Sequence, residues 1–220
     1  MPEGPAAADE EAPRRILFVG NSFVSRNDLP LMVEDLAKSA GHLVESESIV
    51  AGGASLRRHL NSGAIARALA HGRWDQVVLQ EQSTLPIKNP TRYHENVRAV
   101  HALASAAGAR TVLYLTWARR SAPDAQQQLT AAVLAIGAEI GAAVAPAGQA
   151  WQVVLKDHPG IDLYSADGSH PTAAGSWLAA CVLYRTLFRD RELAAAAPGP
   201  AGMAPEVAAV LAEAARRVAR

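Results

Sequence analysis

The sequence predicts an α/β protein: a three-layer α/β/α sandwich whose central parallel sheet of about five strands is covered by helices on both faces. Short apolar runs alternate with helical segments about five times along the chain, and the connections between them are short. The length of 220 residues fits one domain that can bury a sizeable core. No internal repeat is present.

Both ends of the chain differ in composition from its middle. Residues 1–13 are rich in Pro, Ala and Glu, so we expect a disordered tail there. The domain is expected over residues 14–189. A Pro/Gly/Ala-rich linker and a last amphipathic helix then make up residues 190–220.

Five short apolar runs are predicted as the strands of the sheet. The fourth has the strongest strand pattern, whereas the second carries two glutamates and alternates less cleanly. In chain order the predicted strands are Arg15–Val19, Leu43–Val50, Gln76–Gln80, Arg110–Trp117 and Ala142–Ala145.

Seven segments have helical periodicity or clear helix-end signals. Asp28, Ser55 and Thr172 are predicted N-caps, and Gly41 is predicted to end the first helix. The last helix packs either on the domain or on a second subunit of a homo-oligomer, and the sequence leaves both open. The predicted helices are Asp28–Ala40, Ser55–Ala70, Arg92–Ala107, Ala125–Ile140, Gly148–Lys156, Thr172–Phe188 and Pro205–Val218.

Charge and cysteine content exclude several classes of protein. Lys and Arg total 21 and so do Asp and Glu, so no global charge favours nucleic acid or an anionic membrane as a partner, although a local basic patch stays compatible. The single cysteine, Cys181, excludes an intrachain disulfide framework and is predicted to lie in the core. No signal peptide and no run of roughly 18 apolar residues occurs, so we expect a cytoplasmic protein.

Glycine and polar residues follow four of the predicted strands. The sequences are "GNS" at 20–22, "AGGAS" at 51–55, "QEQS" at 80–83 and Thr116-Trp117. Parallel sheets bind ligands at the carboxyl ends of their strands, so these residues are expected to share one rim.

Ser22 can act as a nucleophile only if a base assists it, since a free hydroxyl is barely nucleophilic at neutral pH. His170 follows Asp167 by three residues in "DGSHP", so the carboxylate can orient the imidazole. A simple helix-entry turn is the alternative explanation of this motif. His158 is a weaker candidate base, and the remaining histidines are expected to be solvated: His42, His59, His71, His94 and His101.

These motifs together resemble those of the SGNH/GDSL hydrolase superfamily, over roughly residues 15–188. The resemblance implies a flavodoxin-like fold with Ser22 as nucleophile, His170 as general base and then acid, and Asp167 orienting His170. Ser25 is a poorer candidate because it lies three residues further into the loop. No cluster of His, Cys and Asp has the spacing of metal ligands, so no metal and no cofactor is expected.

The chain departs from the family at two motifs. Asn21 stands where the family usually has aspartate, and "LQEQST" replaces the usual Gly-x-Asn-Asp of the third block. A glutamine amide can replace the asparagine as oxyanion donor, but the sequence does not choose between Gln80 and Gln82. The backbone N–H groups of Ser22 and Gly53 would complete the hole, unless the Gly52-Gly53 pair is an ordinary turn. The residues expected around the oxyanion and substrate are Asn21, Gly53, Gln80, Gln82 and Trp117.

The resemblance implies a serine ester hydrolase that forms an acyl-enzyme. The expected substrates are small-molecule or carbohydrate esters with short-chain or O-acetyl groups. Trp117 and Tyr164 would form an aromatic wall against the acyl group or sugar ring, unless they pack in the core. Glu81 would contact substrate hydroxyls, or else be solvated or paired with an arginine. An acyltransferase with the same triad and a non-catalytic ligand-binding domain are the alternative functions.

Overall fold

The computed structural model describes residues 12–189 and 199–219. The predicted N-terminal tail lies outside the described residues except for residues 12 and 13. The first part of the predicted linker, residues 190–198, lies outside them as well.

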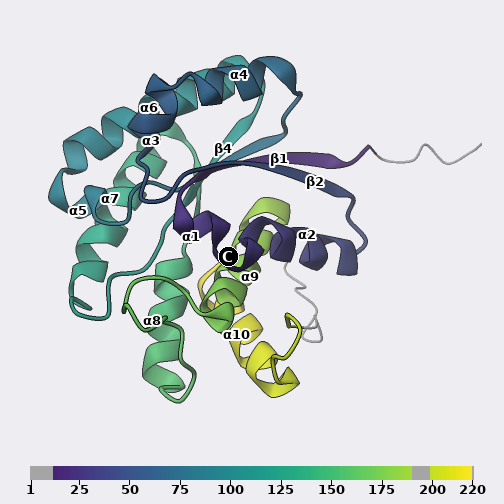
Figure 1. Cartoon of the computed structure of the whole chain (residues 1–220), viewed down its shortest axis with the longest axis vertical. Coiled ribbons are helices and arrows are strands. Elements are labelled where there is room, and N and C mark those ends of the chain that lie inside the picture. Colours follow the sequence, from purple (N-terminus) through teal and green to yellow (C-terminus); the bar gives the residue numbers. More distant parts are fainter. Residues whose placement is uncertain (1–11, 190–198, 220) are drawn as a thin grey trace, which may run out of the picture.

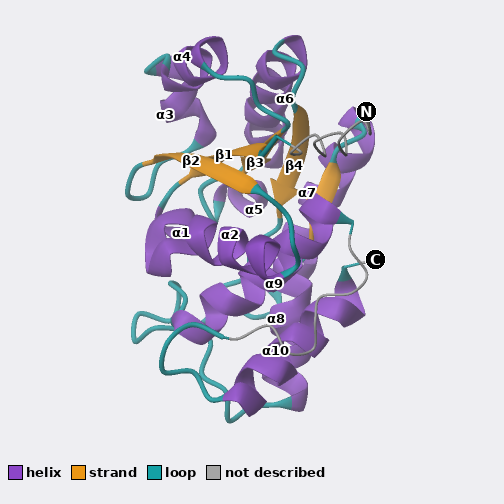
Figure 2. Cartoon of the chain, turned by 90° about the vertical axis from the view of Figure 1, so that its right-hand side faces the viewer, coloured by secondary structure: helices purple, strands orange, loops and turns teal. Residues whose placement is uncertain are grey.

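Five parallel strands form one sheet in the order β2-β1-β3-β4-β5 (Figure 2). This order places the first strand inside the sheet, so successive strands extend it first to one side and then to the other. The predicted α/β sandwich with a parallel sheet is confirmed. The strands are β1 (Arg14–Gly20), β2 (Val44–Val50), β3 (Gln76–Leu79), β4 (Arg110–Tyr114) and β5 (Ala143–Ala145).

Helices cover both faces of the sheet (Figure 1). One face carries α1 (Ser22–Ser25), α2 (Leu29–Ser39), α8 (Ala147–Asp157), α9 (Ala173–Phe188) and α10 (Pro205–Val218). The other carries α3 (Leu56–Asn61), α4 (Ala64–His71), α5 (Leu85–Lys88), α6 (Pro90–Ala106) and α7 (Ala125–Ile140). A 3-10 turn, η1 (Arg26–Asp28), joins α1 to α2.

Alternate residues of β1 enter the two cores, as the two-residue period of a strand requires. Ile16 and Phe18 pack in one cluster, and Leu17 and Val19 pack in the other. All four side chains are fully buried, which explains why the strand reads as an uninterrupted apolar run. Cys181 is buried in the first cluster, as predicted.

Two predicted helix features are wrong. The single helix over Ser55–Ala70 is broken at Gly63, whose φ of 68° lies in the left-handed region that glycine adopts without steric cost. Asp28 occupies the cap position of α2 but has a φ of 51°, and its side chain makes no capping hydrogen bond. Ser55 and Thr172, in contrast, accept hydrogen bonds from Arg58 N and Gly175 N, as predicted.

The remaining boundaries differ from the predicted ones by a few residues. The strand expected over Arg110–Trp117 ends at Tyr114, and α6 begins at Pro90, where Asn89 provides the cap. The short helices α1 and α5 were not predicted. A single turn leaves too little periodicity to be recognised in a sequence.

The C-terminal helix α10 packs on α8 and α9 of the same chain. Its residues Leu211 and Ala215 are fully buried there, and Arg217 pairs with Asp157 of α8. Of the two placements that the sequence left open, the structure has the intramolecular one. Among the described residues, no helix is both long and apolar enough to cross a lipid bilayer.

Candidate active site

The predicted nucleophile and base come from opposite ends of the domain and meet at the carboxyl edge of the sheet. Ser22 lies two residues after β1, and His170 lies in the loop that leads into α9. Ser22 Oγ is 2.8 Å from His170 Nε2, although 148 residues separate them in the chain. The loop that follows the first strand and the loop that precedes α9 therefore bring the two motifs together.

Asn21 fixes the backbone just before Ser22. Its side-chain oxygen accepts from Phe23 N at 3.1 Å and caps the one-turn helix α1. Its side-chain amide donates to Ala54 O at 2.9 Å. Asn21 is almost fully buried, so this geometry favours a positioning role over contact with substrate. An ionised aspartate could not make the bond to Ala54 O, because it has no donor.

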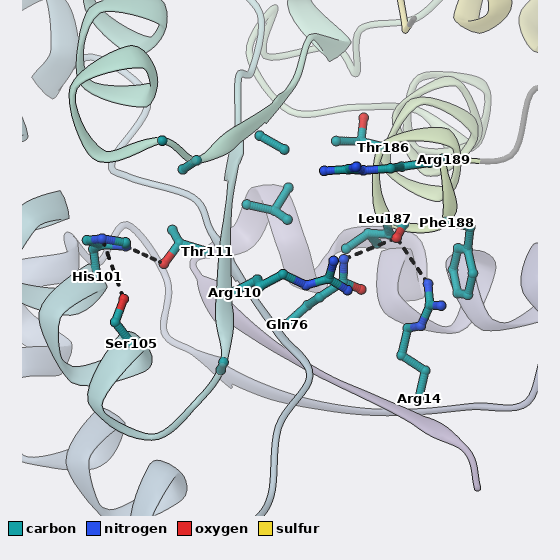
Figure 3. A pocket seen from close by; sticks show the side chains of 15 residues that line it. Arg14, Gln76, His101, Ser105, Arg110, Thr111, Thr186, Leu187, Phe188 and Arg189 are labelled. Carbon is teal, nitrogen blue, oxygen red and sulfur yellow. Dashed lines mark hydrogen bonds between the residues drawn. The ribbon is translucent and has the colours of Figure 1, made fainter. Parts of the chain in front are cut away.

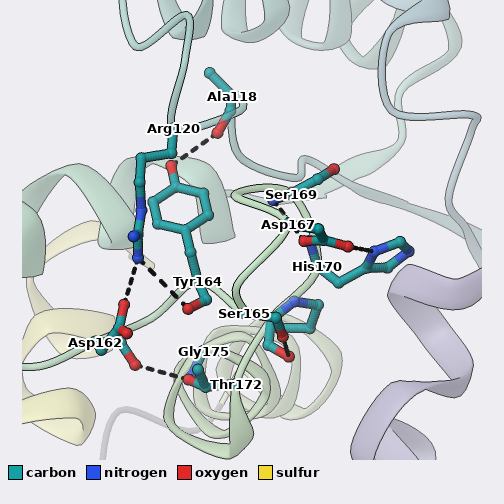
Figure 4. A network of polar contacts seen from close by, with 11 residues as sticks. Ala118, Arg120, Asp162, Tyr164, Ser165, Asp167, Ser169, His170, Thr172 and Gly175 are labelled. Carbon is teal, nitrogen blue, oxygen red and sulfur yellow. Dashed lines mark hydrogen bonds and ion pairs between the residues drawn. The ribbon is translucent and has the colours of Figure 1, made fainter.

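His170 is held by Asp167 in the arrangement that general-base catalysis needs. His170 Nδ1 lies 2.5 Å from Asp167 Oδ2, and the other carboxylate oxygen accepts from the backbone N–H groups of Ser169 and His170 at 2.9 Å each. Figure 4 shows Asp167 between Ser169 and His170. A hydrogen on Nδ1 leaves the Nε2 lone pair free to accept from the Ser22 hydroxyl.

The same contacts determine the charge of the carboxylate. The His170 side chain, followed by the backbone N–H groups of Ser169 and His170, holds the pKa of Asp167 well below its usual range. Asp167 is therefore ionised throughout the neutral pH range. Its negative charge would stabilise the imidazolium that forms when His170 takes a proton.

The turn that carries Asp167 and His170 is anchored from a different strand end. Gly168 has a φ of 66°, and its carbonyl accepts from Arg120 N at 2.8 Å. Trp117 Nε1 donates to Ser169 O at 3.0 Å. Figure 4 also shows Arg120 reaching Asp162 on the same side of this turn.

Trp117 and Tyr164 lie in the core beneath the turn. Trp117 is 2% exposed and stacks on Trp151 with ring centroids 3.6 Å apart. Tyr164 meets Trp151 edge-on, and its hydroxyl donates to Ala118 O. Of the two alternatives that the sequence left open for these aromatic residues, the geometry favours core packing over a substrate wall.

The two candidate oxyanion glutamines occupy different environments. Gln80 is fully buried; its oxygen accepts from Asn21 N at 2.9 Å, and its amide donates to the carbonyl of Glu81. Gln82 is half-buried, and its oxygen accepts from the backbone N–H and the hydroxyl of Thr84, at 3.0 Å each. Of these two glutamines, Gln82 is the one whose amide N–H groups donate to no atom of the described residues. The geometry therefore favours Gln82 as donor.

Glu81 is neither solvated nor paired with an arginine, contrary to one of the predicted alternatives. Its Oε1 accepts from Leu56 N and Gln82 N, and its Oε2 accepts from Asn96 Nδ2. Burial raises the pKa of this carboxyl. Glu81 thus ties the turn after β3 to α3 and α6, a role for which no sequence signal exists because its partners are 25 and 15 residues away.

His59 is another residue that the sequence placed wrongly. It was expected to be solvated, but it is 5% exposed and its Nε2 lies 2.8 Å from Gly20 O. Because a carbonyl only accepts, Nε2 carries the proton here. His59 supports the end of β1 immediately before Asn21. His158, the weaker candidate base, is exposed at the end of α8.

One solved structure with this architecture is also related to this chain in sequence. A protein assigned as an SGNH hydrolase from Slackia heliotrinireducens is 35% identical over 80% of this chain and 100% of its own, with a TM-score of 0.72. The chain belongs to the SGNH hydrolase family. No protein-family model and no curated protein sequence matches it.

More distant structures share the fold of this SGNH hydrolase. A DUF4886 family protein from Bacteroides uniformis has 20% identity and a TM-score of 0.70, and the match covers 94% of both chains. An acetyl xylan esterase from Geobacillus stearothermophilus has 15% identity and a TM-score of 0.61 over 82% of this chain and 94% of its own. These two likenesses show the shared fold, whereas the family assignment rests on the structure from Slackia heliotrinireducens.

A groove of about 380 Å³ extends from the predicted oxyanion residues of this SGNH hydrolase. Gly53, which has a φ of 62°, and Gln82 lie on its wall. A Cβ at position 53 would meet no protein atom within 4 Å, so space does not require a glycine there. The positive φ does, because a side chain strains this backbone conformation. Ala54 and Leu85 are the apolar side chains among its described lining residues.

A second cavity, of about 300 Å³, lies at the opposite edge of the sheet, where β3 and β4 begin (Figure 3). None of the predicted site residues lines it. Arg14 and Gln76 both donate to Leu187 O at 3.1 Å there. These bonds attach the carboxyl end of α9 to the sheet, which gives the polar residues of this cavity a structural role.

Proposed function

We propose that the protein hydrolyses carboxylic esters through a Ser22-His170-Asp167 triad and an acyl-enzyme. The observation that carries this proposal is the continuous hydrogen-bonded chain from Ser22 Oγ to His170 Nε2 at 2.8 Å and from His170 Nδ1 to Asp167 at 2.5 Å. Nucleophile, base and orienting carboxylate have the mutual geometry that serine hydrolases require.

In the first half-reaction Ser22 Oγ attacks the ester carbonyl carbon while His170 Nε2 takes the hydroxyl proton. The tetrahedral intermediate carries its charge on the former carbonyl oxygen. The N–H groups of Ser22 and Gly53 and the amide of Gln82 are the proposed donors to that oxygen. Collapse breaks the bond to the alcohol, which leaves with the proton from His170.

In the second half-reaction His170 removes a proton from water, and the hydroxide attacks the acyl-enzyme carbonyl. The acid is released, and the proton returns from His170 to Ser22 Oγ. Asp167 keeps His170 in the same tautomer throughout both halves.

The preferred substrates are proposed to be short-chain or O-acetyl esters of polar alcohols such as carbohydrates. Arg57, Arg58 and Gln82 line the groove beside Gly53 with hydrogen-bonding groups that could bind the hydroxyls of such an alcohol. An acetyl xylan esterase with the same fold offers a precedent for this chemistry.

Hydrolysis of 4-nitrophenyl acetate tests the proposal. We expect Ser22→Ala and His170→Ala to lower kcat by at least a thousandfold, on the order of the loss seen when a triad member is removed. A fluorophosphonate should label the wild type and fail to label Ser22→Ala. Ser25→Ala, an exposed serine one helical turn away, is the matched control. Labelling that persists in Ser22→Ala would exclude Ser22 as the nucleophile.

A further inference from the structure

Three arginines line the groove beside the predicted oxyanion hole. Arg57 and Arg58 come from α3, and Arg92 comes from the first turn of α6. Among the residues that the structure describes, no carboxylate lines the groove. Because the chain as a whole has equal numbers of acidic and basic residues, this is a local concentration of positive charge and not a property of the whole surface.

Two of the three arginines, Arg58 and Arg92, do not stabilise the fold through polar contacts. Within residues 12–189 and 199–219 neither side chain makes an ion pair or a hydrogen bond, and both are exposed. Arg92 also lies at the amino end of α6, where a cation is unfavourable against the helix dipole. A cationic side chain at such a position costs stability unless an anion binds there.

Arg57 is fixed in place by a buried network. Its Nε donates to Asn96 Oδ1 at 2.9 Å, and Asn96, which is fully buried, donates to Glu81. Both oxygens of Glu81 are occupied by N–H donors, so its charge is not paired with the arginines. The same carboxylate accepts from Gln82 N, so one network positions an arginine and the proposed oxyanion residue together.

We infer that the groove binds an anionic group of the substrate, a carboxylate or a phosphate, on the part of the ester that extends past Gly53 and Gln82. Arg58 and Arg92 would contact the anion. Arg57, held by Asn96, would add a positive charge at the wall of the groove. Guanidinium groups suit both anions because they donate in pairs to planar oxygens. This inference rests on the proposed function, because it places the reacting carbonyl beside Gly53 and Gln82.

Matched aryl acetates test the inference. We would measure kcat/KM for 4-acetoxybenzoate and 4-acetoxyphenyl phosphate against the neutral 4-acetoxybenzamide. The wild type should prefer at least one anionic ester, and added salt should reduce that preference. Comparison of the kcat/KM of the carboxylate ester with that of the phosphate ester shows which anion the groove binds better. An equal kcat/KM for all three esters would overturn the inference.

Arginine variants show whether the groove causes the preference. Arg58→Gln and Arg92→Gln should each lower the anionic-to-neutral ratio of kcat/KM by on the order of tenfold, the value of one charge-assisted hydrogen bond at a partly exposed site. Arg73→Gln removes the same charge near the opposite edge of the sheet and should leave the ratio unchanged. A ratio that falls equally in all three variants would contradict a specific site.

A binding measurement separates failure of the groove from failure of the proposed function. Calorimetric titration of Ser22→Ala with 4-acetoxybenzoate and with 4-acetoxyphenyl phosphate should detect binding that Arg58→Gln or Arg92→Gln weakens. 4-Acetoxybenzamide should bind more weakly than at least one of them. If none of the esters is hydrolysed, the proposed function fails, and these titrations still test whether the groove binds an anion. Equal binding of all three compounds would overturn the inferred anion site whatever the catalytic activity.

Discussion

Replacing Gln82 by alanine tests the oxyanion hole directly. The hole would have three donors, of which the two backbone N–H groups of Ser22 and Gly53 survive the substitution. Loss of one donor typically lowers kcat by about 10²–10³, or about 2.7–4 kcal/mol. Gln82 is half-buried and therefore partly solvated, so we expect the lower end of that range, about a hundredfold. KM should change little, because the charge on the oxygen develops only in the transition state.

Gln82→Ala also removes the two hydrogen bonds from Thr84, and Gln82→Glu is the matched control for that loss. The glutamate keeps an oxygen for the two bonds from Thr84 but replaces the proposed donor by a second acceptor. Its kcat should fall at least as far as that of Gln82→Ala. The assay is steady-state hydrolysis of 4-nitrophenyl acetate. A kcat within about threefold of wild type for Gln82→Ala would refute the reasoning, since one lost donor is worth far more.

Gln80→Ala should behave differently. Gln80 is fully buried and accepts from Asn21 N, so its removal leaves a buried N–H without a partner. The expected loss of unfolding free energy is about 1–3 kcal/mol, measured by urea denaturation. Gln82→Ala should lower kcat with a smaller loss of stability. A reversal of these two patterns would move the donor assignment to Gln80.

Three further variants have expected outcomes. Asp167→Asn should lower kcat by about 10⁴ because His170 loses the partner that fixes its tautomer. The lowered pKa of Asp167 stabilises the fold above the unfolded-state value of about 3.9, so the wild type's advantage in Tm over Asp167→Asn should shrink as the pH falls below 4. Trp117→Phe removes the bond to Ser169 O and should lower kcat more than it raises KM, whereas an equal change in both would contradict positioning of the turn. Glu81→Gln should cost about 1–3 kcal/mol in urea unfolding, because an amide cannot accept from all three N–H donors.

The order of strands and helices was predictable because it depends on local patterns. Apolar runs such as 16–19 enter both cores, and Thr172 and Ser55 cap the helices that follow them. The pairing of Asp167 with His170 was predictable for the same reason, since three residues of turn are enough to bring the two side chains together. Single turns of helix and the break at Gly63 were missed because a few residues carry too weak a period.

The sequence by itself determined the fold class and the residues of the predicted triad, because spacing within motifs and resemblance to a family reach that far. Only the tertiary structure decided that Gln80 supports Asn21 while Gln82 lines the groove, and that Trp117 is packed against Trp151. A glutamine in the chain shows that a donor is present. Whether that donor is already occupied depends on contacts such as that between Asn21 and Gln80, 59 residues apart, which exist only after the sheet has assembled.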